Sequence, residues 1–102
     1  MRYLGAISGS GVLKCDGEMV ARAAYDFEGF FRKPVGVTIS GEIRLSAAAL
    51  KSVFGRSGVQ LLTDEGRLLD LRFSEKTLLG AGDVAHVDVT GGLPANPESW
   101  PP

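Results

Sequence analysis

The sequence is poor in the residues from which disulfides, metal sites and catalytic groups are usually built. Among its 102 residues there is one cysteine, Cys15, and one histidine, His86. A single cysteine cannot form an intrachain disulfide, which fits a reducing compartment. No Cys-x-x-Cys or His-x-x-x-His spacing occurs, so no local motif supplies the three or four ligands that zinc usually takes. We therefore expect no metal or other cofactor.

Membrane segments and an excess of positive charge are missing as well. No apolar run approaches the ~20 residues that cross a bilayer. Gly5, Ser8 and Gly9 interrupt the region where a signal peptide would be continuously apolar. The formal charge is −1, whereas proteins that bind nucleic acid normally carry a basic excess. We expect a cytoplasmic protein without a membrane segment, and the charge argues against nucleic acid as its partner, although a local basic patch is compatible with it.

What the sequence does contain is a long alternation of apolar and polar residues from Val35 to Leu45. Side chains alternate between the two faces of a strand, so this alternation predicts an extended strand with one buried and one solvated face. Gly41 falls on the apolar face, where a missing side chain lets the strand bend. A long, bent, half-buried strand favours a small barrel or a strongly curled sandwich. The apolar face would hold Val35, Val37, Ile39, Gly41, Ile43 and Leu45.

Before this strand, the pattern predicts three further strands and two turns. Residues 2–8 and 12–15 are separated by the flexible Gly9-Ser10-Gly11, which we interpret as a turn. Asp16-Gly17 is a favoured hairpin turn that leads into a strand over residues 18–27. Residues 29–34 are then expected to form a corner, with Pro34 at the start of the long strand.

After Leu45 the pattern changes to that of a helix over about residues 46–54. Ser46 is a good N-cap, Leu50, Val53 and Phe54 share one face, and Gly55 is suited to end the helix. A hairpin over residues 59–63 and 67–74 follows around Asp64-Glu65-Gly66. We expect a short strand at residues 77–79 and a last strand at residues 84–90.

The expected fold is therefore mainly β, a small antiparallel barrel or sandwich of six to seven strands. Its short helix lies between the fourth and fifth strands, which resembles the OB fold in architecture, a likeness that carries no function. PilZ domains are similar in size and β content, but their Arg-x-x-x-Arg segment is absent here. Residues 1–92 would form one domain, and residues 93–102, which are rich in proline, a disordered tail.

The clearest candidate binding surface is the predicted corner with Phe30, Phe31, Arg32 and Lys33. Aromatic side chains beside cations can stack the bases of a nucleic-acid single strand or anchor a protein partner. The alternative is that the aromatic rings belong to the core and the cations reach solvent. In an extended backbone, neighbouring Phe30 and Phe31 cannot both face the same core.

The remaining candidates for chemistry are few. His86 and Asp88 lie two residues apart on one strand face. They could supply two ligands to a metal, as weak candidates, or a general base and the carboxylate that orients it. The alternative is that they belong to a solvated polar face. Cys15 is either a nucleophile or a small buried hydrophobe. Residues 80–85 match G-x-G-x-x-A, but a strand rather than the required helix follows.

Three leucine pairs place apolar side chains off the main core. In Leu61-Leu62, Leu68-Leu69 and Leu78-Leu79, one member of each pair must leave the buried face of a strand, which suggests a surface for self-association. Trp100 either docks on such a surface or is disordered. The sequence thus predicts a non-catalytic interaction module that forms a homo-oligomer or binds a protein partner. The alternative is single-stranded nucleic-acid binding through residues 30–33, and the third hypothesis is a small enzyme or metal site at His86 and Asp88.

Overall fold

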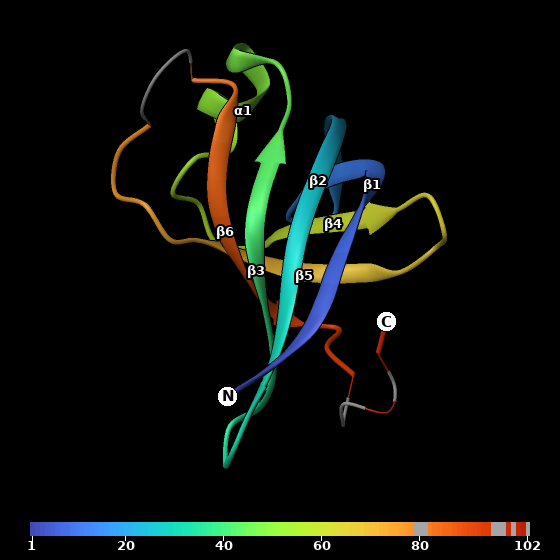
Figure 1. The fold of residues 1–102 in the computed structure, drawn as a ribbon. Coiled ribbons are helices and arrows are strands. Elements are labelled where there is room, and N and C mark those ends of the chain that lie inside the picture. The colour runs from blue at the N-terminus through green and yellow to red at the C-terminus, as the bar shows by residue number, and fades with distance from the viewer. Residues whose placement is uncertain (79–81, 95–97, 99, 102) are drawn as a thin grey trace.

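In the part of the chain that the structure describes, six antiparallel strands close into a barrel with one short helix (Figure 1). The structure is a computed structural model that describes residues 1–78, 82–94, 98, 100 and 101. The order around the barrel is β1-β2-β3-β6-β5-β4, and β4 returns to β1. The predicted β class and the single helix are confirmed, but the helix follows the third strand. The elements are β1 (Arg2–Cys15), β2 (Glu18–Arg32), β3 (Gly36–Arg44), α1 (Ala47–Val53), β4 (Val59–Thr63), β5 (Leu68–Phe73) and β6 (Val84–Gly91).

The turn expected at Gly9-Ser10-Gly11 is wrong, because these residues continue β1 as a single strand. Each of them pairs with a residue of β2, Gly9 with Tyr25 and Gly11 with Ala23. A Cβ on Gly11 would overlap the Leu62 carbonyl oxygen of β4. The glycine therefore lets β4 approach β1 closely rather than reversing the chain, a requirement that the local sequence cannot reveal.

The corner expected at residues 29–34 is also wrong. β2 continues to Arg32, and the chain reverses over residues 33–35 instead. Val35, which the alternation placed in the core, is 67% exposed in this turn. The rest of the alternation is confirmed, since Ile39 and Ile43 are buried. Gly41 faces β2 so closely that a Cβ there would overlap the Asp26 carbonyl oxygen.

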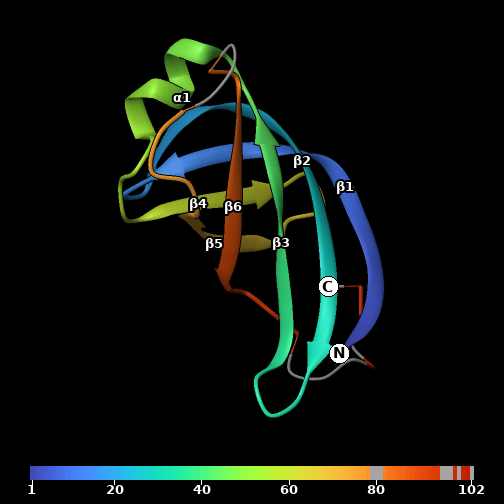
Figure 2. The same cartoon turned by 60° about the vertical axis from the view of Figure 1, so that its left-hand side comes forward.

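The helix forms as its sequence predicts and lies at one end of the barrel (Figure 2). The Ser46 hydroxyl accepts a hydrogen bond from the Ala49 N–H at 3.2 Å, and Gly55 has a φ of +78° just past the helix. Leu50 is fully buried. The apolar stripe of α1 thus covers this end of the core.

The second half of the barrel follows the prediction closely. The β4–β5 hairpin turns through Gly66, whose φ is +91°, and the Gly66 N–H donates to the Thr63 carbonyl. Leu61 and Leu69 are fully buried, while Leu62 and Leu68 are 36% and 43% exposed, as expected for leucine pairs in strands. Thr77 and Leu78 are not in a strand, contrary to expectation, and Leu79 lies outside the described residues. No helix in the described part of the chain is long and apolar enough to cross a membrane.

Candidate functional site

The end of the barrel opposite α1 is open because β4 is short and pairs with only the last part of β1. β4 pairs with Gly11–Cys15, and one more bond, from the Asp64 N–H to the Ser10 carbonyl at 3.0 Å, ends the contact. Figure 2 shows β1 curving away from β4 and β5 beyond this point. Residues 2–9 are paired with β2 on one side and, among the described residues, with no strand on the other.

The backbone groups on this free edge of β1 can be assigned from the alternation of the strand. The Ser10 carbonyl points toward β4, so the N–H and C=O groups of Ser8 and Ala6 point the same way. Natural edge strands are usually protected by charged residues or proline. From Tyr3 to Leu13 the sequence contains neither. The edge is therefore able to accept another strand.

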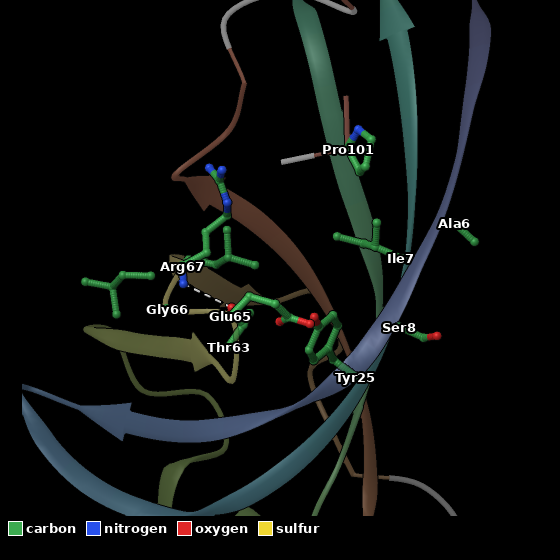
Figure 3. A pocket seen from close by; sticks show the side chains of 11 residues that line it. Ala6, Ile7, Ser8, Tyr25, Thr63, Glu65, Gly66, Arg67 and Pro101 are labelled. Carbon is green, nitrogen blue, oxygen red and sulfur yellow. Dashed lines mark hydrogen bonds between the residues drawn. The ribbon is translucent and has the colours of Figure 1, made fainter. Parts of the chain in front are cut away.

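A cleft of about 750 Å³, here called the mouth cleft, separates this edge from the β4–β5 hairpin. In Figure 3, Ile7 and Ser8 lie on one wall, Arg67 on the other, and Pro101 at the rim. The cleft is lined by Ala6, Ile7, Ser8, Tyr25, Thr63, Pro101 and the hairpin residues from Glu65 to Leu69. The lining is mixed, with apolar side chains beside hydroxyl, carboxylate and guanidinium groups, and suits a peptide better than a purely apolar ligand.

Tyr25 and the tip of the hairpin set the electrostatics of the mouth cleft. Burial, and then the Glu65 and Asp64 carboxylates, raise the pKa of Tyr25, so its hydroxyl is a neutral donor. Arg22 forms two hydrogen bonds of 2.8 Å with the Asp64 carboxylate. These bonds lower the pKa of Asp64 and hold the hairpin against β2. Glu65 has no ion-pair partner within the described residues, so its charge is available to a partner.

The predicted surface at residues 30–33 lies at the end of β2 and is divided between two faces. Phe30 packs beside Tyr3, with ring centroids 5.3 Å apart, and Phe31 packs against the edge of the core. A shallow groove of about 590 Å³, here called the basic groove, is lined by Met1, Arg2, Phe31, Arg32 and Lys33.

Arg2 is the basic-groove residue that sequence reasoning missed. It pairs directly with Phe31 across β1 and β2, and its guanidinium carbon lies 6.0 Å from the ring centroid. The sequence predicts the Asp16-Gly17 turn between β1 and β2, but Arg2 reaches this end only because both strands continue, paired, from that turn to Arg2 and Phe31. The groove thus gathers three cationic side chains around one aromatic ring.

His86 and Asp88 lie on the outer face of β6, and each has its own partner. The His86 Nδ1 lies 2.7 Å from the Ser74 hydroxyl, and Asp88 accepts from Arg72 at 3.2 Å. In the described part of the chain, no group of three or more His, Cys, Asp or Glu side chains is placed to hold a metal ion. Cys15 is buried, and its thiol lies 3.9 Å from the Ser57 carbonyl, which matches its interpretation as a small hydrophobe.

Trp100 docks inside the open end of the barrel. It is half-buried and packs against the core together with Leu93. Its indole lies on Gly5 and Gly29, which pair with each other across β1 and β2. We call these two residues the glycine seat. The sequence alone leaves both docking and disorder open for Trp100, because nothing local indicates that two glycines far earlier in the chain form its contact surface.

No family model matches the sequence. Comparison with curated proteins gives no match, and comparison with solved structures gives none either.

Proposed function

We propose that this protein is a non-catalytic interaction module that self-associates through the free edge of β1. The observation that carries the proposal is the edge around Ala6 and Ser8, which pairs with no second strand in the described part of the chain and lacks the usual protection of an edge strand. Two copies joined edge to edge would continue the sheet across the interface. Because Cys15 is a free thiol, the proposal places the protein in a reducing compartment, the cytoplasm.

The geometry of the edge favours one antiparallel register. Ala6 and Ser8 both direct their hydrogen-bonding groups outward, so Ala6 of one copy pairs with Ser8 of the other around a two-fold axis at Ile7. The β4–β5 hairpin occupies the edge from Ser10 onward, so the incoming chain must leave the edge there. Its exposed Arg2 then comes close to Glu65 of the first copy.

This charge complementarity is the second support for the proposal. Arg2 and Glu65 are both exposed and neither is in an ion pair within the described residues. Because of the two-fold axis, the contact between Arg2 of one copy and Glu65 of the other forms twice in the dimer. An edge of this length buries less area than a standard stable interface, so we expect a dimer that exchanges rapidly.

Sedimentation velocity over a series of protein concentrations tests the proposal. The variants Arg2→Glu and Glu65→Arg should each shift the protein toward monomer because they place like charges together. The double variant should restore the dimer. The control Arg44→Glu reverses the charge at an exposed position of β3 away from the edge and should leave dimer formation unchanged. A wild-type protein that remains monomeric at all concentrations would refute self-association. A double variant that stays dissociated would refute this register.

A second candidate function, single-stranded nucleic-acid binding, is favoured by the basic groove. Its cationic side chains can contact phosphates while Phe31 offers a ring for a base. Fluorescence anisotropy with a short labelled oligonucleotide should show binding that weakens steeply as salt rises. Arg32→Glu with Lys33→Glu should abolish it, and Arg44→Glu should not. Binding that is unchanged by the double variant, or insensitive to salt, would rule out the groove.

His86 and Asp88 give no support to an enzymatic or metal-binding function, because each engages a different neighbour on the outer face of the barrel.

A further inference from the structure

We propose that the glycine seat is a recognition site for the C-terminal segment around Trp100, and that two copies of the protein exchange these segments. The seat is filled by the chain's own tail in the structure, which shows the chemistry that it accepts. The claim that the segment can come from a second copy rests on the proposed self-association. The claim that the seat recognises the segment does not.

The seat exists only because two facing residues have no side chain. A Cβ on Gly29 would overlap the indole atoms Cη2 and Cζ3 and lie 2.9 Å from Cζ2. A Cβ on Gly5 would lie 3.2 Å from the indole Nε1. Gly5 also has a φ of +130°, and the register of β1 against β2 shifts by one residue beside it. Both strands are therefore shaped around a flat ring.

In the described residues beyond Gly92, the tail contacts the barrel through side chains and not through backbone pairing. After Gly92, none of the described residues donates or accepts a backbone hydrogen bond with the barrel. Leu93 and Trp100 provide the apolar contacts, and Pro101 lies at the rim of the mouth cleft. A segment held mainly by one large ring can leave and be replaced by an identical segment without loss of any other structure.

The proposed dimer places both seats within reach of either tail. In the register centred on Ile7, the two Gly5 residues are four residues apart along the strand and one strand apart sideways, which is ~14 Å. Trp100 follows Gly92 by eight positions, and an extended chain over eight such steps spans up to ~26 Å. The Trp100 ring can therefore occupy its own seat or that of the second copy with the same contacts.

Trp100 is the only tryptophan, so fluorescence can test recognition directly. The Trp100→Ala protein emits no tryptophan signal, and a synthetic peptide of residues 91–102 carries the only indole. Adding this protein should shift the peptide emission to shorter wavelength and raise its anisotropy. Gly29→Ala in the Trp100→Ala background should abolish both changes, and it should fold because the ring that it would overlap is gone. Ala24→Val, which adds bulk at an exposed position of β2, should not abolish them.

Mixing two defective variants tests exchange. Gly29→Ala has an intact Trp100 but a blocked seat, so its emission should be shifted to longer wavelength than that of the wild type. Trp100→Ala has an open seat but no ring. Their mixture should recover the short-wavelength emission only if the tail of one copy enters the seat of the other.

The two experiments test recognition by the glycine seat and exchange between copies separately. Absence of peptide binding overturns recognition by the seat, even if sedimentation shows a dimer. Peptide binding without recovery in the mixture overturns exchange and leaves the seat. If Gly29→Ala fails to fold by circular dichroism, binding of a fluorescently labelled peptide of residues 91–102 to the wild type replaces the mixture. The peptide can enter the seat of the wild type only by displacing the protein's own Trp100 ring, so failure to bind the wild type at concentrations that saturate Trp100→Ala overturns exchange.

Discussion

Replacing Ile43 by alanine gives the most direct test of the barrel, because this side chain is fully buried near the C-terminal end of β3. The substitution removes three carbon groups, each worth about 0.8 kcal/mol when buried. The cavity left behind adds to this loss, so measured costs of this substitution in protein cores run to about 2–5 kcal/mol. A domain of this size has about 5–15 kcal/mol of stability, so the variant should remain folded.

The matched control is Val35→Ala at the other end of the same alternation. Val35 is 67% exposed, so its truncation should change the free energy of unfolding by less than about 0.5 kcal/mol. Urea unfolding followed by circular dichroism measures both variants, and the slope with denaturant should stay the same. The melting temperature of Ile43→Ala should fall by about 4–8 °C per kcal/mol lost. Equal costs at the two positions would refute the assignment of the inner face and the position of the turn.

Three further predictions concern the strands that form the open end. Gly41→Ala should lose about 1–3 kcal/mol of stability in the same urea assay, because its Cβ has no room beside the Asp26 carbonyl. The pKa of Tyr25 is raised above 10.0, so stability present below pH 10.0 should be lost as pH rises through the folded-state value. Tyr25→Phe should flatten this alkaline loss, and an unchanged pH profile would contradict the burial of the hydroxyl. The pKa of Asp64 is below 3.8, so its ion pair with Arg22 should stabilise above that pH and weaken as pH falls further. An NMR titration of Arg22→Ala should show the Asp64 pKa rising toward its ordinary value.

The elements that the sequence predicted correctly are those whose causes are local. The cap at Ser46, the turn at Gly66 and the leucine pairs each depend on residues a few positions apart. The two wrong predictions, a turn at Gly9–Gly11 and a corner at residues 29–34, concern segments whose conformation is set by distant residues. Glycine-rich or proline-containing stretches usually break strands, but here pairing with distant residues keeps β1 and β2 extended.

The candidate site was predicted only in part for the same reason. Arg32 and Lys33 are neighbours along the chain, so their cluster was visible, whereas Arg2 joins them only through the pairing of β1 with β2. The free edge near Ser8 could not be found from composition, because a strand pattern does not state which neighbours the strand will have.

By itself, the sequence determined that this chain is a β protein with one capped helix and a buried face through Ile39 and Ile43. Alternation and capping act over a few residues, so they can be read without knowledge of the fold. Only the tertiary structure decided that the sheet closes into a barrel, that β1 and β4 part beyond Ser10, and that Trp100 rests on Gly5 and Gly29. These features depend on which distant strands pair and over how many residues, and the packing of the whole chain decides both.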